Sequence, residues 1–194
     1  GLAWRFVIKK TEPFRIFGET AQFNFTSDMQ TLAANARFSH KTDPWQCTFE
    51  AMYADMSLSS FEKGKLYYSP LMVKGTDAKF VIAESDALRY PGMFLGRGEK
   101  PNSLEASFSN YPEKMYPRQG HQTHYIMEYS EEIARIDGPR TLPWRIVCVA
   151  EDDANLLNND MVYRLATPSK VEDTSWIRPG MAVWDYWNNW NGVG

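Results

Sequence analysis

The sequence FVIAESDALRYPGMFL, residues Phe80–Leu95, combines a β-strand, an acidic strand end and a tight turn. A strand repeats every two residues, so Phe80, Ile82 and Glu84 lie on one face. Glu84 therefore faces the same side as two apolar residues, which is costly unless an arginine, backbone N–H groups or a metal ion meets its carboxylate. Tyr90-Pro91-Gly92 then ends the regular structure, because Pro fixes φ and Gly opens the positive-φ region. Periodicity alone favours a structural acid at this strand end.

Short strands with turn residues between them extend along most of the chain. Pro70 divides the apolar segment Lys65–Val73, and Lys74–Asp77 forms a hairpin turn that leads into the Phe80 strand. Asp152 or Asp153 is expected to cap a single helical turn that runs to Leu157. This pattern predicts an all-β fold, a β-sandwich or a barrel. The other expected strands are Leu2–Lys9, Thr20–Phe25, Trp45–Tyr53, Tyr125–Glu128, Ile133–Asp137, Trp144–Ala150 and Met161–Ala166.

Composition excludes two classes of partner. The 194 residues are 43% hydrophobic, which is enough for a core, yet no apolar run approaches the roughly 18–20 residues of a membrane span. The net charge of -3 argues against a nucleic-acid partner, which requires a basic surface.

Cys47 and Cys148 lie in apolar surroundings and are expected to be buried free thiols. A long-range disulfide between them is the alternative, and an oxidising compartment would favour it.

The C-terminal segment differs from the rest of the chain. Thr174–Gly180 has the composition of an extended linker, and Met181–Trp190 follows it with three tryptophans at Trp184, Trp187 and Trp190. Their spacing fits a helix face, and the alternation around them fits a strand equally well. Because so aromatic a strand would not be left bare at a natural terminus, we expect the chain to be truncated at the start of a second domain.

Seven blocks of residues follow one another along the chain: Leu2–Phe6, Glu84–Asp86, Tyr90–Met93, Arg140–Ile146, Asn158–Ala166, Asp173–Gly180 and Trp184–Asn188. In this order they resemble glycoside hydrolase family 97. The acidic strand end at Glu84 and the turn at Tyr90–Met93 look like those of the family, and Leu2–Phe6 resembles the segment where its N-terminal sheet continues. The likeness covers essentially all 194 residues.

The resemblance implies a domain organisation. Members of the family have a large N-terminal β-sandwich of the galactose-mutarotase type, then a (β/α)₈ barrel and a small C-terminal β-domain. By that likeness, residues 1–172 form part of the β-sandwich, residues 173–180 form the interdomain linker, and residues 181–194 form the first strand of a truncated catalytic barrel. The catalytic carboxylates of the family lie on later barrel strands, so no catalytic residue is expected in this chain.

The resemblance also implies site residues. Glu84 matches the β-sandwich glutamate that helps to bind the active-site Ca²⁺, whose other protein ligands are glutamates of the barrel. Asp86 is adjacent but is not expected to be a second ligand. Trp187 and Asn188 would lie near the C-terminal end of the first barrel strand, where barrel enzymes bind substrate, and an indole ring stacks well on the apolar face of a sugar. The family suggests a periplasmic or secreted protein.

Two functions follow. In the first, the chain is the N-terminal part of a calcium-dependent, exo-acting α-glycoside hydrolase, either an α-glucosidase or an α-galactosidase. Glu84 then supplies one metal ligand and the chain supplies a wall of the active site, completed by the protein's own catalytic barrel, and an oligosaccharide or α-glycoside is the substrate. The fragment alone would be inactive.

The alternative is a stand-alone carbohydrate-binding or structural β-sandwich module. Sequence leaves the substrate sugar, the inverting or retaining course and the oligomeric state open.

Overall fold

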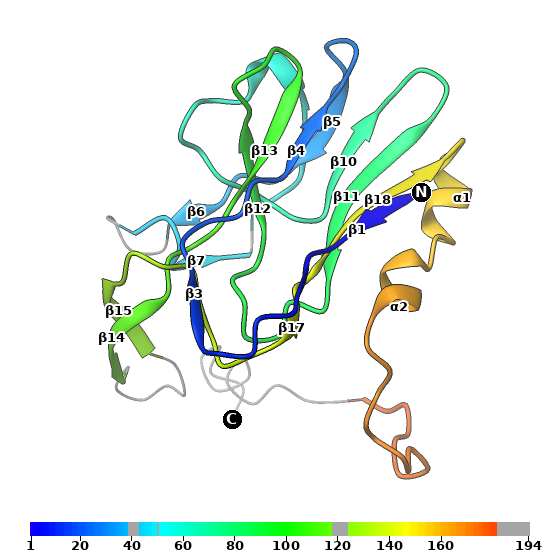
Figure 1. Cartoon of the computed structure of the whole chain (residues 1–194). Coiled ribbons are helices and arrows are strands. Elements are labelled where there is room, and N and C mark those ends of the chain that lie inside the picture. The colour runs from blue at the N-terminus through cyan, green and yellow to red at the C-terminus, as the bar shows by residue number, and fades with distance from the viewer. Residues whose placement is uncertain (39–42, 50, 118–123, 182–194) are drawn as a thin grey trace, which may run out of the picture.

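The predicted Phe80 strand is β11, Lys79–Ser85, and it pairs antiparallel with β18, Trp144–Ala150, over its whole length. In this register Glu84 lies opposite Arg145. The computed structural model describes residues 1–38, 43–49, 51–117 and 124–181. Within them, β11 and β18 are neighbouring interior strands of a six-stranded antiparallel sheet in the order β1-β18-β11-β10-β5-β8 (Figure 1). The other strands of this sheet are β1 Leu2–Trp4, β10 Leu71–Lys74, β5 Gln30–Ala33 and β8 Ala54–Ser57.

A second, four-stranded sheet has the order β4-β13-β12-β9 in the described part of the chain. Its strands are β4 Gln22–Asn24, β13 Ser103–Ser107, β12 Phe94–Arg97 and β9 Tyr67–Tyr68. Four two-stranded ribbons extend from the sheets: β14 Pro112–Pro117 with β15 His124–Tyr129, β16 Ala134–Ile136 with β3 Phe14–Ile16, β17 Arg140–Thr141 with β2 Val7–Ile8, and β6 Arg37–Phe38 with β7 Cys47–Thr48.

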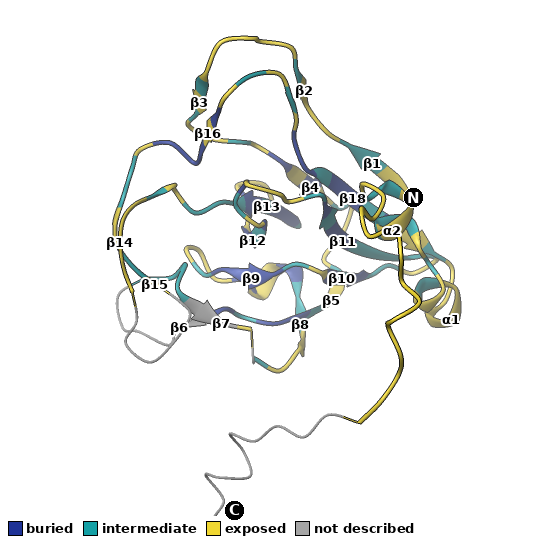
Figure 2. Cartoon of the chain, turned by 90° about the horizontal axis from the view of Figure 1, so that it is seen from below, coloured by how far each residue is buried: buried dark blue, intermediate teal, exposed yellow. Residues whose placement is uncertain are grey.

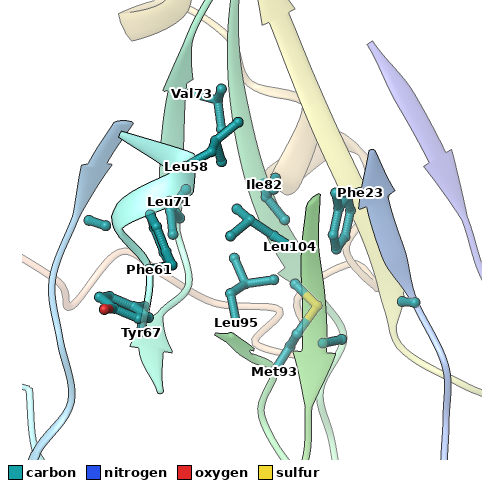
Figure 3. Packing of buried hydrophobic residues seen from close by; sticks show 13 residues of the cluster. Phe23, Leu58, Phe61, Tyr67, Leu71, Val73, Ile82, Met93, Leu95 and Leu104 are labelled. Atoms are coloured by element: carbon teal, nitrogen blue, oxygen red, sulfur yellow. The ribbon is translucent and has the colours of Figure 1, made fainter. Parts of the chain in front are cut away.

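The hydrophobic core lies between the two sheets. Ile82 of β11 and Leu71 of β10 contribute from the six-stranded sheet, and Leu95 of β12 and Leu104 of β13 contribute from the four-stranded sheet (Figure 3). Phe61, which follows the short 3-10 helix η1 at Leu58–Ser60, packs into the same cluster. Side chains of two facing sheets that interdigitate in this way define a β-sandwich. The predicted all-β sandwich is therefore confirmed.

Two short helices cover the outer face of the six-stranded sheet, α1 at Asp153–Leu157 and α2 at Met161–Leu165. Ala83 of β11 and Cys148 of β18 are buried beneath them, so these central strands are buried on both faces. The helices themselves lie at the exposed periphery of the molecule (Figure 2). None of the helices in the described residues has the length and apolarity needed to span a bilayer.

Several local predictions are confirmed. Asp152 caps α1 by accepting a hydrogen bond from the backbone N–H of Asn155 at 2.7 Å. Pro70 separates β9 from β10, and the turn after Lys74 joins β10 and β11 as a hairpin. Cys148 is a buried free thiol, whereas the side chain of Cys47 lies outside the described residues.

Two predicted strands are wrong. Met161–Ala166 is not a strand but contains α2, whose first N–H is accepted by the side chain of Asn159 at 3.2 Å. Three apolar residues of this segment, Met161, Val162 and Leu165, pack on the outer face of the six-stranded sheet. This contact requires a helical spacing, and tertiary packing therefore overrides the strand preference of the segment.

The predicted strand Trp45–Tyr53 is reduced to the two residues of β7. The side chain of Asp43 accepts the N–H of Trp45 at 2.9 Å and so turns the chain at the start of the segment. The side-chain amide of Gln46 then bonds both the N–H and the C=O of Ile126 on β15, at 3.1 and 3.0 Å. Side-chain bonds thus replace the backbone ladder that the alternation predicts.

Removal of core volume between the sheets is expected to destabilise the domain. Leu104 is fully buried, so Leu104→Ala should lower the free energy of unfolding by about 3 kcal/mol through lost transfer energy and a cavity. Leu88 is 69% exposed, and Leu88→Ala should change it by less than about 0.5 kcal/mol. Urea denaturation measures both values, and equal losses for the two variants would contradict this location of the core.

Candidate functional site

Strand β11 carries Glu84 to the end of the sandwich and directs its side chain to the core face. Ile82, two residues earlier, is fully buried in the core between the sheets, and Glu84 shares its face. The turn that follows contains two non-glycine residues with positive φ, Asp86 at 59° and Arg89 at 51°, so the chain reverses sharply. It then returns as Tyr90–Met93 beneath the carboxylate. The inward direction predicted for Glu84 is confirmed.

Glu84 belongs to a buried cluster of four side chains, Glu19, Glu84, Tyr90 and Arg145, which we call the Glu84 cluster. The Arg145 guanidinium is its centre, with 1% of the side chain exposed. Arg145 donates through Nη1 to Oε2 of Glu84 at 2.6 Å. It also binds Glu19 in a bidentate manner, through Nε to Oε1 at 2.6 Å and through Nη2 to Oε2 at 2.8 Å. Such a fork is the strongest geometry available to an arginine–carboxylate pair.

Two further donors complete the cluster. The Met93 N–H donates to Oε1 of Glu84 at 2.8 Å, so the turn after β11 holds the oxygen that Arg145 does not reach. The Tyr90 hydroxyl donates to Oε2 of Glu19 at 2.9 Å. The aromatic ring of Phe108 lies beneath the guanidinium, with 4.7 Å between the Arg145 Cζ atom and the ring centroid. Every hydrogen-bonding oxygen of the cluster therefore has a partner, and its geometry is rigid.

Burial and charge act against each other in this cluster. Burial raises the pKa of the Glu84 carboxyl above its ordinary value, although the Met93 N–H and the Arg145 charge oppose the rise. Burial also raises the pKa of the Tyr90 hydroxyl far above its ordinary value, and the Glu19 carboxylate adds to this effect. Burial would lower the pKa of Arg145, but hydrogen bonding and attraction to Glu19 outweigh it and raise that pKa. The positively charged Arg145 guanidinium is thus shared by the two carboxyl groups of Glu19 and Glu84.

Glu84 can serve as one ligand of a Ca²⁺ ion but not as a site on its own. Its side chain is 18% exposed, against 4% for Glu19, so solvent or another domain can reach it. Each carboxylate oxygen has two acceptor positions, and each oxygen of Glu84 accepts one bond from within the chain. One position per oxygen stays available. Calcium requires six to eight oxygens, and the described residues contain no group of three His, Cys, Asp or Glu that could hold a metal.

The other residues considered for the site, Asp86, Trp187 and Asn188, are not part of the Glu84 cluster as the structure describes it. Both carboxylate oxygens of Asp86 accept hydrogen bonds from Thr167, one from its N–H at 2.8 Å and one from its hydroxyl at 2.9 Å. Asp86 therefore anchors the segment after α2. Trp187 and Asn188, predicted to contact substrate, lie outside the described residues. Prediction from sequence missed Glu19, Tyr90 and Arg145, of which only Arg145 had a signal: a charge within the apolar strand Trp144–Ala150.

Two cavities lie near this end of the sandwich. One of about 720 Å³ is lined by the turn residues Arg89, Tyr90 and Pro91 and by residues of the β14 and β16 region. The other, of about 310 Å³, lies between the six-stranded sheet and the two helices and is lined by Glu84, Cys148 and Val162, among others. Glu84 lines the smaller cavity only.

The model of the glycosyl-hydrolase 97 N-terminal family matches residues 1–168, which is most of the chain. The chain belongs to this family. The resemblance seen in the sequence is therefore confirmed. The matched residues include every member of the Glu84 cluster.

Relatives of this glycosyl-hydrolase 97 N-terminal chain include larger enzymes. It is 35% identical over 196 aligned residues to the retaining alpha-galactosidase of Bacteroides thetaiotaomicron, covering 98% of this chain and 30% of that protein. It is 27% identical over 187 residues to a probable retaining alpha-galactosidase of Streptomyces bingchenggensis, covering 96% of this chain and 24% of that protein. The chain thus spans less than a third of the length of these relatives.

Solved structures support the fold of this family member. A glycoside hydrolase family 97 enzyme from Pseudoalteromonas sp. strain K8, in complex with acarbose, superposes with a TM-score of 0.68 at 19% identity. A variant of that enzyme in complex with panose gives 0.69 at 20% identity. Both comparisons cover 92% of this chain and 24% of the other chain. At this level of identity they establish a shared β-sandwich.

Loss of the buried cation is expected to be strongly destabilising. Arg145→Met leaves the carboxylates of Glu19 and Glu84 buried without their counter-charge, which should lower the free energy of unfolding by about 3–5 kcal/mol. Arg5 stacks over the Trp144 ring at 4.1 Å on the exposed side, and Arg5→Met should cost less than about 1 kcal/mol. Urea denaturation of both variants tests this difference, and a loss below about 1 kcal/mol for Arg145→Met would show that the ion pairs do not support the fold.

Proposed function

We propose that this chain is the N-terminal β-sandwich of a calcium-dependent, exo-acting α-glycoside hydrolase. The observation that carries the proposal is the family match over residues 1–168. Both curated relatives are named as retaining alpha-galactosidases, which favours an α-galactoside over an α-glucoside as substrate. The catalytic residues of the proposed enzyme belong to a barrel domain, in the part of the relatives that this chain does not span.

In this proposal the chain contributes Glu84 as one Ca²⁺ ligand. The support is its position at a strand end, its partly exposed carboxylate and the acceptor position left on each oxygen. When bound, calcium is a cation that ties carboxylates from two domains together. Arg145 and the Met93 N–H hold the Glu84 oxygens, and carboxylates of the barrel domain would supply the remaining oxygens of the calcium site.

The reaction itself takes place on barrel carboxylates. For a retaining course, one carboxylic acid protonates the leaving glycosidic oxygen while a second carboxylate about 5–5.5 Å away attacks the anomeric carbon. Water, deprotonated by the first group, then hydrolyses the glycosyl-enzyme ester and restores both residues. This chain forms one wall of that site and excludes water from it.

The remaining parts of the proposal concern organisation. Residues 1–172 are assigned to the sandwich, residues 173–180 to the interdomain linker and residues 181–194 to the first barrel strand. Trp187 and Asn188 are assigned to contacts with the sugar, because the C-terminal ends of barrel strands carry substrate contacts. Export to the periplasm or the exterior is proposed on the family likeness alone.

Calcium removal tests the proposed function. The full-length protein is expected to hydrolyse aryl α-galactosides faster than aryl α-glucosides. It should lose this activity in a chelator and regain it when Ca²⁺ is added back, because the metal holds the two domains together. Activity that persists in a chelator at full rate would refute the calcium requirement.

Glu84→Gln tests the ligand assignment. The substitution removes a negative charge from the site, and calcium affinity follows the number of charged ligands, so the calcium concentration for half-maximal activity should rise about 100-fold. Glu132→Gln is the matched control, since Glu132 is also a buried carboxylate paired with an arginine, Arg135, at 2.6 Å. A Glu84→Gln enzyme with the calcium response of the Glu132→Gln control would remove Glu84 from the site.

A further inference from the structure

Glu84 is held by a chain of hydrogen bonds that begins at Tyr90 and passes through Glu19 and Arg145. The Tyr90 hydroxyl binds Glu19, Glu19 binds two of the Arg145 nitrogens, and Arg145 binds Glu84 with the third. Glu19 is 4% exposed, and its hydrogen-bonded link to Glu84 runs through the Arg145 guanidinium. The negative charge of Glu19 also acts on Glu84 directly. Because the guanidinium of Arg145 is bonded by Glu19 on one side and by Glu84 on the other, its position is fixed.

The charges of the cluster give Glu19 a second effect. Glu19 and Glu84 together carry two negative charges against the single positive charge of Arg145, so the cluster is net negative. Without the Glu19 charge, Arg145 and Glu84 neutralise each other. A carboxylate already neutralised by a guanidinium attracts a divalent cation weakly, because the nearby positive charge repels the ion.

On these grounds we propose that Glu19 and Arg145 are positioning residues that make Glu84 competent to bind a divalent cation, with Tyr90 fixing the orientation of Glu19. This inference rests on the proposed role of Glu84 as a calcium ligand. Arg145 sets the direction of the Glu84 carboxylate, and Glu19 supplies the negative charge that Arg145 would otherwise cancel. Calcium affinity is therefore controlled by a carboxylate that does not itself touch the ion.

The test measures calcium affinity of the full-length protein directly, by isothermal titration with CaCl₂ after chelator treatment. Glu19→Gln keeps the size of the side chain and removes its charge, and the dissociation constant for Ca²⁺ should rise about tenfold, as for other partners of ligating groups. Tyr90→Phe removes only the hydroxyl and should give a smaller rise in the same direction. Glu132→Gln, a buried carboxylate outside the Glu84 cluster, should leave the constant unchanged.

Unfolding temperatures measured in chelator separate positioning from a structural role. A merely structural role for Glu19 would lower the unfolding temperature of the metal-free protein without changing its calcium affinity once folded. The inference is overturned if Glu19→Gln binds calcium as the wild type does while Glu84→Gln does not. If Glu84→Gln also binds calcium normally, the proposed ligand is wrong and the inference falls with it.

Discussion

One buried guanidinium holds this end of the sandwich together. Arg145 has almost no contact with solvent, so its desolvation must be offset by the carboxylates of Glu19 and Glu84 and by the face of Phe108. These partners come from segments far apart in the chain, since Glu19 precedes β4 and Glu84 ends β11. The ion pairs therefore join three separate segments at this end of the sandwich.

The same interaction depends on strand register. Glu84 and Arg145 are direct neighbours on antiparallel strands. A shift of one strand by one residue would turn its charged side chain to the opposite face and separate the pair. Burial of β11 and β18 on both faces opposes such a shift, because each face has its own apolar cluster. Core packing thus sets the register, and the register places the charges.

Sequence patterns predicted the architecture well and the cluster only in part. Period-two alternation correctly oriented Ile82 and Glu84, and Pro70 and Asp152 acted through their local backbone chemistry, which needs no knowledge of distant residues. The helix at Met161 was missed because its conformation depends on the sheet beneath it. The partners of Glu84 could not be named for the same reason: Glu19 and Arg145 are separated by more than a hundred residues, and periodicity carries no information on such pairings.

The bond between Thr167 and Asp86 has a consequence for the path of the chain. Asp86 lies two positions after Glu84, and both of its oxygens are occupied by Thr167, the second residue after α2. The polypeptide is thereby tethered to the sandwich beside Glu84 before it enters the stretch 168–181. The outgoing stretch therefore starts from a fixed point next to the strand that carries Glu84.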